Sequence, residues 1–172
     1  SVKESGVAAE YMAQEFTFLT DRRHITAVVA RTVLGRIPER NVVLAVDASG
    51  SMAAYLSDVK DALNLALVQQ FHKSERLFNI IACTGQQSEF HRDLVDATPQ
   101  TIENAMRFCE SIAAGGTSNL FEAIRHAFRC LDLHAMYLIT DGKCDVGQEF
   151  LAKVRALYFQ HPGRPKVNTV GI

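Results

Sequence analysis

The sequence predicts an α/β fold with a mostly parallel, doubly wound central sheet and helices on both of its faces. Three observations predict it. Val42–Val46 and Met136–Ile139 are short apolar runs, which are typical of the buried central strands of a parallel sheet. The segments between such runs carry apolar residues at helical spacing. Strand and helix patterns alternate from Val42 to the end of the chain, which indicates successive strand–helix–strand units.

The first half of this pattern predicts two buried strands, a helix and an edge strand. Val42–Val46 is the first strand, and Leu77–Cys83 is the second. After a polar turn, Ser88–Arg92 predicts a short return strand, antiparallel at the edge of the sheet. The helix between the two buried strands has one apolar face, which consists of Leu56, Val59, Leu63, Ala66, Leu67 and Phe71.

The second half predicts three further helices and two strands. Thr98 suits the N-cap of a helix and Pro99 its first position. That helix directs Ile102, Ala105, Met106, Cys109 and Ile112 inward. The elements after it are a helix from about Leu120 to Leu131, the strand Ala135–Thr140, the helix Gln148–Tyr158 with Phe150, Leu151, Val154 and Leu157 inward, and the strand Val167–Ile172.

Residues 1–40 match none of these elements. Val7–Leu19 has weak helical spacing, and His24–Ile37 is rich in β-branched residues and fits one strand or two. We therefore divide the chain into an N-terminal extension, residues 1–40, packed on or beside a domain of residues 41–172. Because the last predicted element is a strand, we expect this domain to be truncated before a final covering helix.

Composition limits the classes of function. The chain has 172 residues, enough for a sizeable core, and a net charge of −1, which gives no general attraction to nucleic acid or to an anionic membrane. It has no run of eighteen apolar residues and no signal-peptide pattern. Cys83, Cys109 and Cys130 lie in apolar patterns, and Cys144 lies in a loop. Free thiols in a reducing, cytoplasmic setting are therefore expected over disulfides.

Polar residues gather where two predicted strands end. Asp47-x-Ser49-x-Ser51 directly follows the first strand, and Asp141 follows the third buried strand. Thr117 lies in a Gly-Gly-Thr turn before a predicted helix. Ligands bind at the carboxyl ends of the strands in such sheets, and two carboxylates placed there repel each other unless a cation lies between them. The hydroxyl-rich, low-charge set suits Mg²⁺, which keeps open positions, better than Ca²⁺.

These three motifs, in this order and spacing, resemble the metal-ion-dependent adhesion site of the von Willebrand factor A (VWA) domain family. The resemblance implies a Rossmann-like VWA fold with one antiparallel edge strand. It implies that Ser49 and Ser51 bind the metal directly, and that Thr117 does so in one conformational state. Asp47 and Asp141 would act directly or through water. The cofactor would be Mg²⁺, or Mn²⁺ or Ca²⁺, and a Glu or Asp of a partner protein would fill the vacant coordination position.

The resemblance covers about Asn41 to Ile172. The phrases Phe78–Ile81 and Ala114–Thr117 resemble the branch shared by inter-alpha-trypsin inhibitor heavy chains and intracellular multidomain members, including the subgroup called von Willebrand factor A domain-containing protein 3. We therefore expect an intracellular, cation-dependent protein-binding module that is not an enzyme. Its partner-binding rim would include Tyr55, Asn119, Leu120 and Lys143.

Other interpretations of the same residues exist. The domain could be an architectural module of a larger assembly, with the metal site stabilising or empty. The Asp47–Ser51 segment alone could be a helix N-cap turn. An esterase nucleophile at Ser49 is disfavoured because Asp47 replaces the first Gly of G-x-S-x-G, and no motif places His126 or His134 as its base. The Gly115–Ser118 turn lacks the lysine of a nucleotide-binding P-loop.

Overall fold

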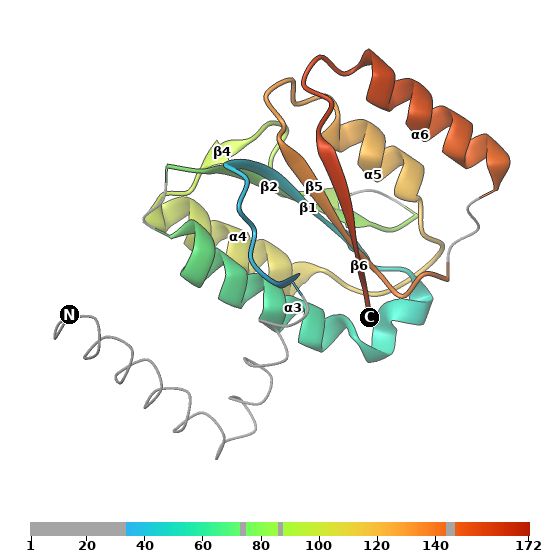
Figure 1. The fold of residues 1–172 in the computed structure, drawn as a ribbon. Helices are drawn as coiled ribbons and strands as arrows, with labels where there is room; N and C mark the ends of the chain where they lie inside the picture. Colours follow the sequence, from blue (N-terminus) through green and yellow to red (C-terminus); the bar gives the residue numbers. More distant parts are fainter. Residues whose placement is uncertain (1–33, 73–74, 86–87, 144–146) are drawn as a thin grey trace, which may run out of the picture.

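A mostly parallel sheet forms the centre of the molecule. The structure is a computed structural model, which describes residues 34–72, 75–85, 88–143 and 147–172. The strand order is β3-β2-β1-β5-β6 (Figure 1). The parallel strands are β1 (Asn41–Asp47), β2 (Leu77–Cys83), β5 (Ala135–Thr140) and β6 (Lys166–Gly171). β1, β2 and β5 are almost wholly buried, as their apolar runs predict.

The antiparallel edge lies beside β2. The predicted return strand is present but short: β3 (Ser88–Glu89) pairs with the carboxyl half of β2. A second two-residue strand, β4 (Val95–Asp96), pairs antiparallel with the amino half of β2. The sequence pattern missed β4, because two residues are too few to show an alternation.

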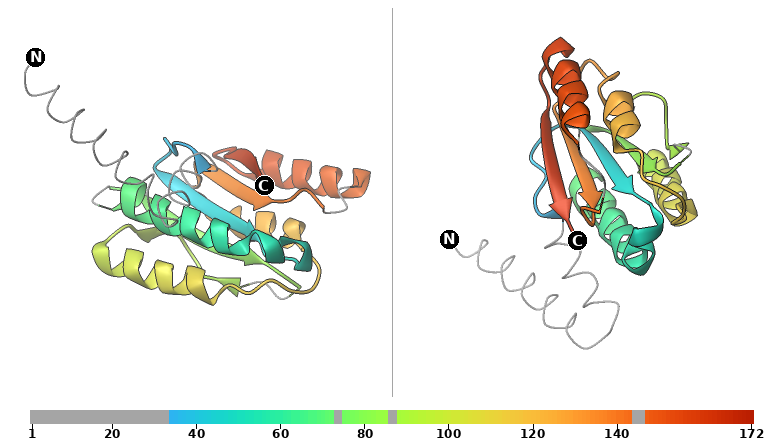
Figure 2. Two further views of the ribbon diagram at one scale, coloured as in Figure 1. Left: turned by 90° about the horizontal axis from the view of Figure 1, so that it is seen from below. Right: turned by 90° about the vertical axis from the view of Figure 1, so that its right-hand side faces the viewer.

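Helices cover both faces of the sheet (Figures 1 and 2). α3 (Leu56–Ala66) and α4 (Pro99–Ser111) lie on one face, and α5 (Leu120–Ala127) and α6 (Gln148–Gln160) lie on the other. A 3₁₀ turn, η1 (Gly50–Ala54), precedes α3, and a π turn, η2 (Leu67–Phe71), continues it. Among the described residues, no helix is both long and apolar enough to cross a bilayer.

Two apolar clusters form the core, one on each face of the sheet. The larger joins β1, β2 and β5 to α3 and α4, and the smaller joins the opposite face to α5. α6 differs from its prediction, because none of its residues is fully buried and the side chain of Leu151 is 52% exposed. α6 packs beside α5, and its residues Phe150, Val154, Leu157 and Tyr158 pack against the smaller cluster.

The segment before β1 packs against the core. Leu34 and Ile37 are buried in the larger cluster. The backbone N–H of Ile37 donates to Gln70 Oε1 at 2.8 Å, and Gln70 Nε2 donates to the carbonyl of Gly35 at 2.9 Å. The patterns at 7–19 and 24–33 lie outside the described residues, so the division at residue 40 stays a prediction.

A polar network joins this segment to the sheet. Tyr137 of β5 donates its hydroxyl to Glu39 Oε2 at 2.8 Å, and Lys166 Nζ of β6 donates to Glu39 Oε1 at 3.1 Å. Burial alone would raise the pKa of Glu39. The hydrogen bonds from Tyr137 and Lys166 and the charge of Lys166 outweigh it and hold this pKa below its ordinary value of 4.5.

We expect Tyr137→Phe to destabilise the fold by about 1.5–3 kcal/mol, the usual contribution of a hydrogen bond to a charged group. The pKa of Glu39 is lower in the folded state than its ordinary value of 4.5. Its contribution to folding stability is therefore present above pH 4.5 and is lost as the pH falls through the pKa of the folded state. Urea unfolding of the variant and of the unchanged chain, at pH 7 and at lower pH, measures the loss of stability, which should be smaller in acid. Tyr55→Phe, at an exposed position, is the control; equal effects of the two changes would contradict the prediction.

Candidate metal centre

Two loops at the carboxyl edge of the sheet are fixed to each other by backbone hydrogen bonds. The loop after β1 contains Gly50, whose N–H donates to the carbonyl of Gly116 at 3.1 Å. In return, the N–H of Gly115 donates to the carbonyl of Ala48 at 2.9 Å. Gly116 has a φ of 63°, which favours glycine. The Asp47–Ser51 and Gly115–Asn119 turns, far apart in sequence, therefore form one unit.

Asp47 connects the first loop to the end of β5. Its side chain is 1% exposed. Oδ1 accepts the backbone N–H of Ser49 at 3.0 Å, and Oδ2 accepts the hydroxyl of Thr140 at 2.7 Å. Thr140 Oγ1 in turn accepts the N–H of Gly142 at 3.1 Å. The buried carboxylate therefore holds both the serine turn and the Asp141 turn in place.

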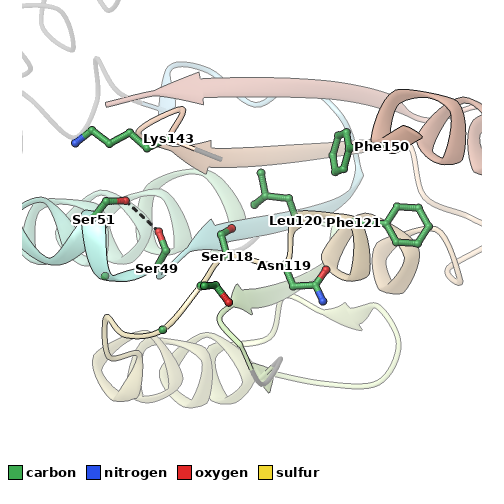
Figure 3. Close-up of a pocket in the computed structure, with 11 residues that line it drawn as sticks. Ser49, Ser51, Ser118, Asn119, Leu120, Phe121, Lys143 and Phe150 are labelled. Atoms are coloured by element: carbon green, nitrogen blue, oxygen red, sulfur yellow. Dashed lines mark hydrogen bonds between the residues drawn. The ribbon is translucent and has the colours of Figure 1, made fainter. Parts of the chain in front are cut away.

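Ser49 and Ser51 direct their hydroxyls toward each other, with 3.2 Å between the two Oγ atoms (Figure 3). Adjacent ligands of an octahedral Mg²⁺, at about 2.1 Å from the ion, lie about 3 Å apart. Ser49 occupies the N-cap position of η1 but its side chain makes no cap hydrogen bond, and neither does that of Tyr55 at the N-cap of α3. Helix capping therefore does not account for these serines.

Asp141 carries a buried oxygen without a hydrogen-bond donor. Its Oδ1 accepts the N–H of Lys143 at 3.1 Å. Oδ2 has no hydrogen-bond partner among the described residues and lies 3.4 Å from Lys143 Nζ. The backbone N–H of Lys143 lowers the pKa of Asp141 against the effect of burial, helped by the Ser51 hydroxyl and the Lys143 side chain. Asp141 is therefore ionised at neutral pH and lies beside Ser51.

The hydroxyl groups open into a hollow of about 540 Å³ (Figure 3). Hydroxyl and amide side chains line one part of it, and apolar side chains line another. Among the described residues, its lining consists of Ser49, Gly50, Ser51, Gly116, Thr117, Ser118, Asn119, Leu120, Phe121, Lys143 and Phe150.

The hollow brings together most of the residues predicted from sequence. Ser49, Ser51 and Thr117 line it, and so do Asn119, Leu120 and Lys143 of the predicted rim. Asp47 and Asp141 lie outside the lining but contact the loops that form it. Tyr55 is 38% exposed and is not part of the lining.

The apolar wall of the hollow, formed by Leu120, Phe121 and Phe150, is not predicted by the sequence pattern. Helical spacing assigned Phe150 to the core, and it is half-buried. Phe121 follows Leu120 in the first turn of α5. Its place just after the Gly115–Asn119 turn is the one sequence feature that indicates a position at the hollow.

Carboxylates and imidazoles do not dominate this site. Within the described part of the chain, no group of three or more His, Cys, Asp or Glu side chains is arranged to hold a metal. The candidate donors are instead three hydroxyls and two carboxylates. His126 lies elsewhere, with Nδ1 3.1 Å from Glu89 Oε2, and exposed His134 precedes the amino end of β5. Cys144 lies outside the described residues.

The fold and this arrangement of loops define a domain of the von Willebrand factor type A class. The chain belongs to the von Willebrand factor type A domain family, whose sequence model matches residues 40–157. Domains of this class commonly mediate protein–protein interaction. The family and the Rossmann-like fold predicted from sequence are thus confirmed.

Individual relatives support the predicted branch. The chain is similar to von Willebrand factor A domain-containing protein 3A of Homo sapiens, at 33% identity over 116 residues, which are 67% of this chain and 10% of the relative. It is also similar to inter-alpha-trypsin inhibitor heavy chain H3 of Pongo abelii, at 28% identity over 67% of this chain and 14% of the relative. The match therefore spans about a tenth of the first relative's length.

A solved structure shows the same fold. The von Willebrand factor type A protein from Catenulispora acidiphila superposes with a TM-score of 0.62, at 20% identity, over 76% of this chain and 32% of that one. At this identity the likeness concerns the fold alone.

Proposed function

We propose that this chain is a divalent-cation-dependent protein-binding module. The cation, Mg²⁺ or otherwise Mn²⁺ or Ca²⁺, would be held by Ser49, Ser51 and Thr117, with Asp47 and Asp141 acting directly or through water. The observation that carries the proposal is Asp141 Oδ2, a buried carboxylate oxygen that has no hydrogen-bond partner among the described residues and only an ion-pair contact with Lys143 Nζ, at 3.4 Å. Such an oxygen beside two converging hydroxyls suits a hard cation.

The residues present fit the ion. The separation of 3.2 Å between the two serine oxygens is close to the spacing of about 3 Å for adjacent octahedral ligands. Backbone hydrogen bonds between the two glycine-containing loops preorganise the donors. Asp47 keeps the serine turn in place through the N–H of Ser49. When bound, the cation would offer a coordination position to an Asp or Glu side chain of a partner protein.

Selection from a random peptide display library tests this function. The 172-residue chain is immobilised with Mg²⁺, and bound phage are eluted with EDTA. We expect enrichment of peptides that carry Asp or Glu, that bind again with Mg²⁺ or Mn²⁺, and that are released by EDTA. Peptides that remain bound equally well in EDTA would contradict the proposal.

Lys143 should weaken metal binding. Its ammonium lies 3.4 Å from Asp141 Oδ2 and therefore competes with the cation for this carboxylate. We expect Lys143→Ala to raise the affinity for Mg²⁺ by roughly three- to ten-fold at low salt, and by less at high salt because the lysine is exposed. Titration calorimetry measures the affinity. Lys60→Ala removes the same charge from α3, where the ammonium donates to the carbonyl of Glu110, and should leave the affinity unchanged.

An architectural role is the second candidate. The hydrogen bonds between Gly50 and Gly116 and between Gly115 and Ala48 hold the loops together by protein contacts alone, which suits an architectural module whose metal site is only stabilising or empty. In that case Mg²⁺ would raise the melting temperature but would not change the capture of any peptide.

We propose no catalytic activity. His126 and His134, the bases considered for Ser49, are not among the residues that line the hollow.

We also propose a reducing, intracellular setting. The buried cysteines Cys83, Cys109 and Cys130 are free thiols, and burial raises the pKa of Cys83 and of Cys109 to about 12, so they are unreactive.

A further inference from the structure

The geometry points to a two-part recognition of the partner: one protein segment supplies a carboxylate to the hydroxyl cluster and a bulky apolar side chain to the wall formed by Leu120, Phe121 and Phe150. This inference rests on the proposed function and adds the chemistry of the partner's binding segment. The acidic residue alone would then be a poor ligand for this domain.

The hydroxyls and the apolar wall belong to the same hollow. Figure 3 shows Ser49 and Ser51 at one end, Phe121 and Phe150 at the other, and Ser118 between them. The volume of about 540 Å³ lies within the range of roughly 300–1,000 Å³ that is usual for ligand pockets. An extended segment advances about 3.3 Å per residue, so side chains a few positions apart can reach both ends.

The apolar wall is held firmly. Leu120 and Phe121 occupy the first turn of α5, where Asn119 Oδ1 accepts the N–H of Glu122 at 3.2 Å and caps the helix. Leu120 is buried in the smaller core cluster, and Phe150 of α6 packs against the same cluster. Phe121 and Phe150 are only half-buried, so they keep apolar surface facing the hollow. A fixed, partly exposed aromatic pair favours a bulky apolar side chain over water.

The charged groups that line the hollow do not repel an acidic segment. Its described lining includes Lys143 and no Asp or Glu. Lys153 Nζ lies 5.8 Å from the centre of the Phe121 ring, at the apolar end, and is ion-paired with Glu149 Oε1 at 2.7 Å. Ser118 lines the hollow, and its buried Oγ has no hydrogen-bond partner among the described residues.

Two peptide libraries test the inference. Both carry one fixed glutamate; in one the other positions include aromatic and large aliphatic residues, and in the other these are omitted. We expect the 172-residue chain with Mg²⁺ to select binders from the first library at least about ten-fold tighter than any from the second. Equal affinities from the two libraries would overturn the inference.

Substitutions in the wall provide the second arm. Phe121→Ala and Phe150→Ala should weaken the selected peptides about ten-fold or more, without changing the affinity for Mg²⁺. Phe159→Ala is the matched control, because Phe159 lies on α6, is 61% exposed and is not part of the lining. Unchanged peptide affinity in folded wall variants would overturn the inference.

A fluorescent reporter covers the case in which the alanine variants fail to fold. The chain contains no Trp, so Phe121→Trp introduces a single indole at the wall and keeps an aromatic ring. We expect its emission to shift to the blue when a selected peptide binds, but not when its apolar residue is replaced by glycine. The same shift with both peptides would overturn the inference. Failure to select any peptide that needs Mg²⁺ would overturn the proposed function, and this inference with it.

Discussion

Replacing Ser49 and Ser51 together by alanine is expected to abolish Mg²⁺ binding while leaving the fold intact. The hydroxyls face each other and the hollow, and Ser51 is exposed. Their loss removes two metal ligands but no side-chain cap of η1. Changes even to outer groups around a metal typically cost 10–100-fold in affinity, so the loss of two direct ligands should exceed about 100-fold. Titration calorimetry with MgCl₂ measures this affinity.

The control for this double variant is Ser57→Ala, which removes an exposed serine on α3 away from the hollow. It should bind Mg²⁺ as the unchanged chain does. The melting temperature without metal should be similar in all three proteins. If the double variant still bound Mg²⁺ with unchanged affinity, the hydroxyls would not be ligands, and the proposed function would lose its basis.

The strands of the sheet could be predicted closely because burial leaves a local signal. β2 and β5 coincide with their predicted ranges, since a strand buried on both faces reads as a continuous apolar run. The ends of helices were harder. α5 ends at Ala127 rather than near Leu131, because Phe128 adopts the C-cap position and tight turns follow, with Cys130 N–H bonded to the carbonyl of Ala127. Leu131 is then 67% exposed, although its apolar side chain extended the helical pattern.

The candidate site could be predicted as a set of residue types but not as a shape. The spacing of Asp47, Ser49 and Ser51 marks one loop, and parallel strands bring Asp141 to the same edge of the sheet. The bonds that fix Gly50 to Gly116 join residues far apart in sequence and leave no local pattern. For the same reason the wall made by two separate helices appears only in the folded chain. Lys143 lies only two residues after Asp141, but spacing alone does not show that the turn brings its ammonium to this carboxylate.

Asp47→Ala is expected to weaken both the fold and the metal site. The carboxylate is buried and accepts hydrogen bonds from the N–H of Ser49 and the hydroxyl of Thr140. Each buried donor left without a partner costs about 1–3 kcal/mol, so with two such donors the free energy of unfolding should fall by roughly 2–6 kcal/mol. Asp47→Asn keeps the size of the side chain and one acceptor oxygen. It should therefore cost less stability, yet it removes the charge that favours a cation.

Measuring the loss of unfolding free energy with and without Mg²⁺ separates the two roles of Asp47, support of the loops and support of the metal. With Mg²⁺ at about 100 times its dissociation constant, the unchanged chain gains about 2.7 kcal/mol and a variant that does not bind gains none. Urea unfolding with Mg²⁺ and with EDTA should therefore show a larger loss of stability for both variants in Mg²⁺. If the loss were the same in both conditions, Asp47 would support the loops but not the metal.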